Sequence, residues 1–290
     1  MRWFAAAALL VFVGQAAAAS HSHIGVLPRA GRIMSLKVCT DELLLDLVPP
    51  SRIASITFLS RENASLKVWP QGGHVPVNHG TAEEILSTRP DLILTDPFMA
   101  PALRPILAKS GARIVEVPPA ENFAQIRDAV RLVARAVGEE ARGEALIARL
   151  DATLRDLEKH KPAKALTVAE WGTGGLVPGK GGLFDTIVTA AGGRNLAKGG
   201  YYDVESLIAA RPDALVYGDT YEGTASLRSD QDLHPALMKR YAGKRISYRA
   251  LYGCGVPETA DAAKQLQDRL RGTGPPAPPA PPAPHQGRAQ

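Results

Sequence analysis

Few residues of this chain combine the types and the spacing that enzyme or metal chemistry requires. Cys39, Asp41 and His79 could supply a nucleophile, a carboxylate and a base, but nothing in their spacing supports such an arrangement, and the chain has no Gly-x-Ser-x-Gly nucleophile elbow. His74 and His79 lie five residues apart with no nearby pair of carboxylates, which is a weak signal for a metal site. The sequence therefore predicts neither an enzyme nor a protein-bound metal ion.

A glycine-rich segment gives a second, partial chemical signal. Residues 174–180 read Gly-Gly-Leu-Val-Pro-Gly-Lys and match the front of a phosphate-binding loop. The next residue of such a loop should be Ser or Thr, whose hydroxyl holds magnesium, but here it is Gly181. A glycine-rich turn between a strand and a helix explains this segment better than nucleotide binding does.

Aromatic residues gather in the loops that follow the expected strands. In open α/β sheets, ligands bind beyond the carboxyl ends of the strands. Aromatic faces with a few polar anchors suit a large, flat or amphiphilic ligand, although many of these side chains could equally pack the loops in which they lie. The ligand-binding candidates are Cys39, Phe58, His79, Phe98, Trp171, Tyr202, Tyr221 and Tyr252.

The elements that must position these loops occur twice in the sequence. Residues 81–94 (TAEEILSTRPDLIL) recur as residues 203–216 (DVESLIAARPDALV) at a constant offset and without a gap. Thr81 and Asp203 are suited to cap a helix, and the Arg-Pro pair in each copy should end that helix. The strand that follows is continuously apolar, which is typical of parallel strands covered on both faces. Two copies predict two similar α/β lobes with a cleft between them.

Each copy also carries a glutamate two residues after the expected cap. Glu83 and Glu205 occupy this same position. An acid in the first helical turn interacts favourably with the helix dipole, and this explains both residues on spacing alone. A role in docking to a partner is the alternative.

The N-terminus predicts export. Arg2, an apolar run to Val13 and the small residues before Ser20 are typical of a cleaved signal peptide over residues 1–19, and the apolar run is too short to span a bilayer. We expect a soluble, monomeric, exported protein. The net charge of +5 comes from basic residues interspersed with acids, so no nucleic-acid partner is expected.

The mature chain divides into an N-terminal lobe (20–138), a long helix (139–163), a C-terminal lobe (164–271) and a tail (272–290). Leucines at helical spacing mark one apolar face of the long helix. It is long enough to bridge two lobes, but the same pattern fits a surface helix of one lobe. The proline-rich tail is expected to be extended or disordered.

From about Arg32 to Leu270 the chain resembles the periplasmic substrate-binding proteins of ABC importers for iron complexes and vitamin B12. The resemblance implies two Rossmann-like α/β lobes joined by a single long helix, with the ligand cleft between them. The segments that carry it are Arg32–Leu36 with Thr40–Leu44, Glu83–Leu94, Gly179–Asn195 and Glu205–Val216.

The resemblance implies a periplasmic receptor without catalytic activity or a cofactor of its own. Its ligand would be a metal chelate, either a ferric siderophore or a corrinoid, and its partner an inner-membrane ABC permease. In this family a glutamate in each lobe docks on arginines of the permease, and Glu83 and Glu205 match those positions. The alternatives are a haem-binding transport receptor, a metal-binding or chelatase-like enzyme on the same fold, and an interaction protein that acts through its proline tail.

Two features depart from the family pattern or lie outside it. No residue before Glu83 matches the family's haem-ligating tyrosine or cobalamin-stacking tryptophan, and the corresponding stretch reads Pro76–Gly80. Cys39 and Cys254 lie in segments that should face the cleft. An oxidising compartment permits a disulfide between the lobes, but the cysteines could also bind a soft metal or remain apart.

Overall fold

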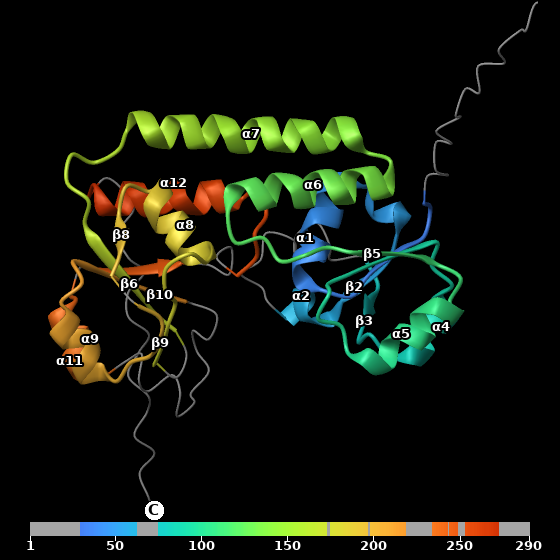
Figure 1. Ribbon diagram of the computed structural model, residues 1–290, viewed down its shortest axis with the longest axis horizontal. Helices are drawn as coiled ribbons and strands as arrows, with labels where there is room; N and C mark the ends of the chain where they lie inside the picture. The colour runs from blue at the N-terminus through green and yellow to red at the C-terminus, as the bar shows by residue number, and fades with distance from the viewer. Residues whose placement is uncertain are drawn as a thin grey trace, which may run out of the picture.

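The structure is a computed structural model that describes residues 30–62, 75–172, 175–196, 198–218, 234–242, 244–248 and 253–272. Two α/β lobes lie side by side, and a long helix, α7, runs along both (Figure 1). No helix within these ranges is long and apolar enough to cross a bilayer. The expected signal peptide, and all of the expected tail beyond Gly272, lie outside the described residues.

The first lobe is built on a parallel five-stranded sheet in the order β3-β2-β1-β4-β5. Helices cover both of its faces, as the continuously apolar strands predict. In β1, Ile33 packs into the cluster under α1 and α6, whereas Met34 packs on the opposite face under α4 and α5. The strands are β1 (Ile33–Ser35), β2 (Ile53–Thr57), β3 (Val77–Asn78), β4 (Leu92–Thr95) and β5 (Arg113–Glu116); the α-helices are α1 (Val38–Leu47), α2 (Phe58–Glu62), α4 (Ala82–Thr88), α5 (Arg104–Lys109) and α6 (Phe123–Val137).

The second lobe contains a parallel four-stranded sheet in the order β11-β10-β6-β8 and a small antiparallel pair, β7 with β9. Its core also has two sides: Val168 and Val216 face α8 and α12, whereas Ala169 and Leu215 face α9 and α11. The strands are β6 (Thr167–Trp171), β7 (Leu176–Val177), β8 (Arg194–Asn195), β9 (Gly200–Tyr201), β10 (Ala214–Gly218) and β11 (Arg245–Tyr248); the helices are α8 (Leu183–Ala190), α9 (Val204–Ala210), α11 (Pro235–Arg240) and α12 (Thr259–Leu270).

The sequence repeat forms α4–β4 in one lobe and α9–β10 in the other. Thr81 caps α4 through a capping box with Glu84, and the Asp203 carboxylate caps α9 by accepting from the Ser206 amide at 2.6 Å. Both helices end at an arginine in left-handed conformation, Arg89 (φ 47°) and Arg211 (φ 51°). The predicted caps and breaks are therefore confirmed.

The aspartate of each repeat fastens the helix–strand turn to the neighbouring strand. The Asp91 carboxylate accepts from the amides of Gly31 and Arg32, both at 3.0 Å, just before β1. The Asp213 carboxylate accepts from the Thr167 amide at 2.8 Å at the start of β6. Matching bonds in both lobes confirm that the repeat builds equivalent structures.

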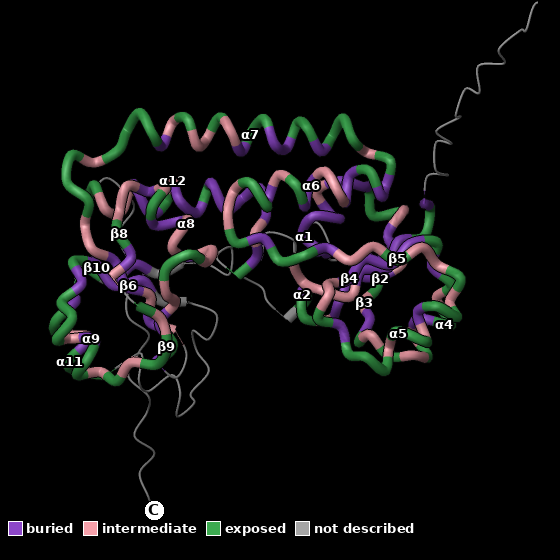
Figure 2. Tube along the Cα trace, viewed as in Figure 1, coloured by how far each residue is buried: buried purple, intermediate pink, exposed green. Residues whose placement is uncertain are grey.

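Besides α7, helix α12 packs against the cores of both lobes. In α7 (Glu140–Lys159), Leu150 belongs to the core of the first lobe and Leu157 to that of the second, while the outer side is exposed (Figure 2). In α12, Ala260 belongs to the first core and Leu266 to the second. The two-lobe prediction is confirmed, but the expectation of a single connecting helix omits α12.

Candidate functional site

A pocket of about 340 Å³ lies between the lobes at the carboxyl edge of the first sheet. Its first-lobe wall follows the ends of β1, β4 and β5, and includes Lys37, Asp96 and Val117. Its other wall includes Leu183 of α8 and the glycines on either side of Cys254. This is the position at which ligands bind to open α/β sheets.

Two charged side chains of the pocket, Lys37 and Asp96, pair with each other. Lys37 Nζ lies 3.1 Å from Asp96 Oδ2, and Asp96 Oδ1 accepts from the Phe98 amide at 3.0 Å. Thr186 Oγ1 of α8 donates to the carbonyl of Glu121 at 2.8 Å, which joins the lobes directly. The pocket is thus mainly apolar, with its ion pair in the wall.

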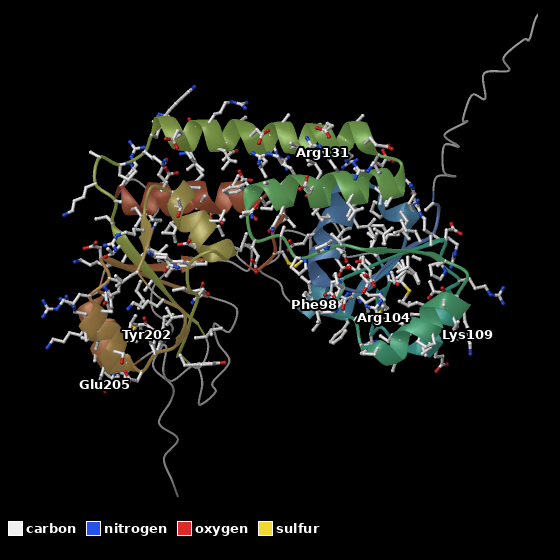
Figure 3. The ribbon with its side chains drawn as sticks, in the orientation of Figure 1. Phe98, Arg104, Lys109, Arg131, Tyr202 and Glu205 are labelled. Atoms are coloured by element: carbon white, nitrogen blue, oxygen red, sulfur yellow. A yellow bond between two sulfur atoms is a disulfide. The ribbon has the colours of Figure 1, made fainter. Side chains whose placement is uncertain are left out.

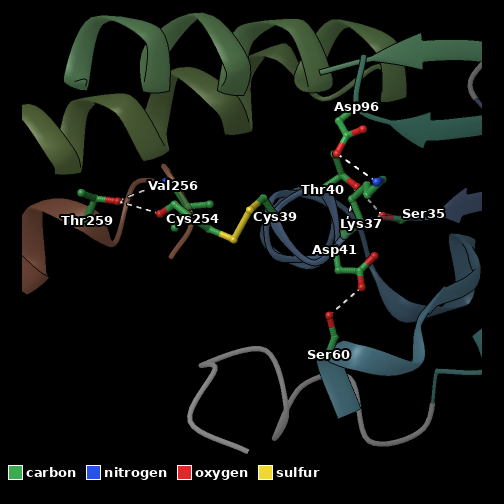
Figure 4. Close-up of a disulfide and its surroundings, with 10 residues drawn as sticks. All are labelled: Ser35, Lys37, Cys39, Thr40, Asp41, Ser60, Asp96, Cys254, Val256 and Thr259. Carbon is green, nitrogen blue, oxygen red and sulfur yellow. Dashed lines mark hydrogen bonds and ion pairs between the residues drawn. A yellow bond between two sulfur atoms is a disulfide. The ribbon is translucent and has the colours of Figure 1, made fainter. Parts of the chain in front are cut away.

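Cys39 and Cys254 form a disulfide beside this pocket (Figure 4). Cys39 is the second residue of α1 and lies half-buried in the pocket wall, whereas Cys254 is buried between β11 and α12. Of the three arrangements open to the two cysteines, the structure has the bond between segments 215 residues apart. Among the described residues, there is no group of three or more His, Cys, Asp or Glu side chains that could hold a metal ion.

His79 is oriented by two neighbours at the carboxyl end of β3. Its ring stacks on Phe58, which follows β2, with centroids 4.7 Å apart. Its Nδ1 lies 3.0 Å from Glu84 Oε1, and its backbone amide donates to Glu84 Oε2 at 2.9 Å. Partial desolvation raises the pKa of Glu84, but hydrogen bonds from His79 and Thr81 outweigh this effect and lower it to about 2. The carboxylate is therefore charged at neutral pH.

Asp41, the carboxylate of the unsupported catalytic arrangement considered from the sequence, is a buried acid of α1. Its Oδ2 accepts from the Thr57 amide at 2.9 Å. The same oxygen accepts from Ser60 Oγ at 2.6 Å, which ties α1 to α2 (Figure 4). Desolvation raises its pKa to about 8, although bonds from Ser35, Ser60 and Thr57 lower it in part. Asp41 thus helps to position Phe58.

The aromatic candidates differ in exposure and in position. Phe98 follows β4 and is 77% exposed, on the side of the first lobe nearer the second (Figure 3). Trp171 was expected at the cleft, but it is only 2% exposed, because this last residue of β6 packs into the core under α9 and α11. Tyr202 is half-buried against the same core, and its neighbour Tyr201 is 79% exposed. Tyr221 and Tyr252 lie outside the described residues.

Glu83 and Glu205 occupy equivalent places on the two lobes. Each is the second residue of a short helix, α4 or α9, and each is exposed. Figure 3 shows Glu205 at the outer end of the second lobe. The structure thus presents one exposed carboxylate from each copy of the repeat.

Residues 33–201 match the sequence profile of the periplasmic binding protein family. The match spans more than half of the chain, which therefore belongs to this family of binding proteins. The resemblance inferred from sequence is confirmed at this level.

Solved structures of the same fold cover most of the chain. The haem-binding protein RhuT from Roseiflexus sp. RS-1 has a TM-score of 0.71 and 23% identity, over 84% of this chain and 99% of its own. HutB of Vibrio cholerae, also a periplasmic haem-binding protein, has a TM-score of 0.69 and 20% identity, over 82% and 98%. A periplasmic haem-binding protein from Pseudomonas aeruginosa has a TM-score of 0.67 and 22% identity, over 86% and 95%. No curated protein matches the sequence significantly.

Proposed function

We propose that this protein captures a metal chelate between its lobes in the periplasm, that it delivers the chelate to an ABC permease, and that the chelate is haem. The observation that carries the proposal is the oriented imidazole of His79. A carboxylate can only accept, so Glu84 favours the tautomer in which Nδ1 carries the proton. Nε2 accepts no hydrogen bond from any described residue, and its lone pair remains available to a metal.

A carboxylate that receives the second N–H of a histidine is the usual support of a metal-ligating imidazole. One imidazole cannot hold a free ion, but it suits a metal that is already chelated and has one open position. Haem iron has open axial positions, whereas a ferric siderophore surrounds its iron. Chemistry at His79 therefore favours haem over the ferric siderophores, and the choice between haem and a corrinoid rests on the relatives named above.

Exposed aromatics would contact the faces of a planar macrocycle. Phe98 extends from the first lobe next to Asp96 of the pocket, and Tyr201 extends from the second. Aromatic faces stack on flat, apolar rings. The three relatives named above are haem-binding proteins by name, which supports the same choice of ligand.

Substitution of His79 and of its partner tests the proposal. His79→Ala should weaken haemin binding at least about tenfold and shift the Soret band, because the iron loses its axial ligand. Glu84→Gln should weaken binding by a factor of roughly 10 to 100, as loss of a metal ligand's supporting carboxylate does. Affinity and band position would be measured by absorbance titration of the mature protein.

Glu83→Gln is the matched control. It removes an acid from the same helical turn, one residue away, without touching His79. Wild-type haemin affinity and an unchanged Soret band in both His79→Ala and Glu84→Gln would contradict the assigned ligand.

We further propose that Glu83 and Glu205 dock on the permease. One carboxylate from each lobe would set the orientation of the receptor over a two-subunit partner. Such exposed charges govern register and association rate more than affinity.

A further inference from the structure

The segment that carries Cys254 leaves the second lobe and packs into the first. Cys254 and Val256 are buried in the first lobe's core. Gly255 lies against the Ala120 carbonyl so closely that no side chain would fit there. The Thr259 hydroxyl closes the turn, accepting from the Val256 amide and donating to the Cys254 carbonyl, both at 3.1 Å. Residues 253–259 are therefore a docked strap, a name we use below for this segment.

The strap continues into α12, which returns to the second lobe. Leu266 lies in the second core, and Gln267 Nε2 donates to the Leu157 carbonyl of α7 at 2.9 Å. At the other end, Glu258 pairs with Arg149 of α7 at 3.0 Å. The disulfide thus ties the N-terminal end of α12, a helix that packs on both lobes, to the first lobe.

The two sulfurs differ in access. Cys254 is 5% exposed, whereas Cys39 lines the interlobe pocket. Cys39 also sits in the first turn of α1, which has no side-chain cap, and Lys37 lines the same pocket. A helix N-terminus stabilises a thiolate, whereas the Lys37 ammonium is paired with Asp96 at 3.1 Å. The pocket is hence a route to Cys39 Sγ for an attacking thiolate, and the helix N-terminus favours the later release of Cys39 from a mixed disulfide.

We propose that Cys39–Cys254 is a redox latch between the lobes, opened by a dithiol that enters the interlobe pocket. A thiolate of the dithiol attacks Cys39 Sγ, forms a mixed disulfide and expels the Cys254 thiolate, which takes up a proton. The second thiolate of the dithiol then attacks the dithiol's own sulfur in the mixed disulfide. This releases the Cys39 thiolate, which is protonated in turn. Two electrons and two protons pass to the protein, and the dithiol becomes a cyclic disulfide. Packing alone then holds the strap, which opens more often.

Hydrogen–deuterium exchange of the mature protein, oxidised or reduced with dithiothreitol, tests the latch. Amides of residues 254–262 should exchange at least tenfold faster after reduction, while those of α4 and β4 stay unchanged. A Cys39→Ser/Cys254→Ser double variant should exchange fast with or without dithiothreitol. Equal exchange of the strap in oxidised and reduced wild-type protein would overturn the proposal, whether or not the variant folds.

Single variants test the point of attack. The thiol of Cys39 in Cys254→Ser should react with a disulfide reagent at least tenfold faster than the thiol of Cys254 in Cys39→Ser. If these variants do not fold, alkylation of the reduced wild-type protein should label Cys39 first. Equal or reversed reactivity would overturn the assigned route. Neither result depends on the ligand proposed above.

Discussion

Glu83 and Glu84 are adjacent acids with different surroundings. Glu84 turns back to His79 and Thr81, where its bonds complete the helix cap and orient the imidazole. Glu83, by contrast, is exposed to solvent, and it occupies the same helix position as Glu205 in the other lobe. A single helical turn therefore contributes to both proposed contacts, one with the ligand and one with the permease.

Asp41 makes the stability of the protein depend on pH. Its folded-state pKa of about 8 lies above the ordinary value of 3.8, so the folded protein binds this proton more tightly than the unfolded chain. This contribution to stability is full below about pH 3.8 and is lost as the pH rises toward 8. The neutral acid is thus the stabilising form.

Asp41→Asn should remove this dependence, because the amide oxygen can still accept from Thr57 and Ser60 without carrying a charge. We expect the variant to gain more than about 1.4 kcal/mol of unfolding free energy relative to wild type between pH 4 and pH 8. Urea unfolding across this range measures the difference. Parallel pH profiles for the two proteins would show that the buried carboxyl does not titrate as argued.

At the scale of elements, the two repeats share a costly helix ending. Arg89 and Arg211 adopt left-handed backbone angles that favour glycine. Arg89→Gly and Arg211→Gly should each raise the unfolding free energy by up to about 1 kcal/mol. Glycine removes the strain of the left-handed conformation, but it loses more conformational entropy on folding than arginine does. Arg142→Gly is the control, since it lies inside α7 and should destabilise by about 1 kcal/mol. A loss of stability in both repeat variants would contradict this reading.

The repeated elements could be predicted because their signals are local. The Thr81 cap and the apolar β4 strand each depend on a few neighbouring residues. Elements of two residues, such as β7 and β9, are too short to show any periodicity. The apolar face of α7 could be predicted because its leucines recur at helical spacing along one segment. That α12 also spans both cores could not be predicted, because it depends on contacts between residues far apart in the sequence.

The site was less predictable because it depends on tertiary contacts. Cys39 and Cys254 could be placed near the cleft, but their pairing requires the strap to cross between lobes. The burial of Trp171 depends on helices that are distant in sequence. His79 was a candidate, whereas its support by Phe58 joins the ends of two adjacent strands.

At the scale of the whole molecule, the lobes are linked by α7, by α12 and by the disulfide. Such linkage favours small relative movements over wide opening. Small movements would keep Glu83 and Glu205 at a nearly fixed separation, as the proposed docking on two permease subunits requires.

Charge reversal tests this arrangement. Glu83→Arg/Glu205→Arg should reduce chelate uptake by cells at least about tenfold, while haemin affinity is retained. The new arginines would meet the arginines expected on the permease, and such juxtaposition of like charges costs several kcal/mol. Glu140→Arg is the control, since it reverses an exposed acid in the first turn of α7, away from the repeats. Undiminished uptake by the double variant would exclude the docking role.

We propose above all that the cleft holds a chelate whose metal has an open axial position. Fluorescence titration of the purified mature protein with haemin, cobalamin and several ferric siderophores tests it most directly. We predict saturable binding of one haemin per protein and much weaker binding of the other chelates. Saturable binding of a ferric siderophore or cobalamin without binding of haemin would contradict the choice of ligand, and binding of none of them would contradict the receptor function itself.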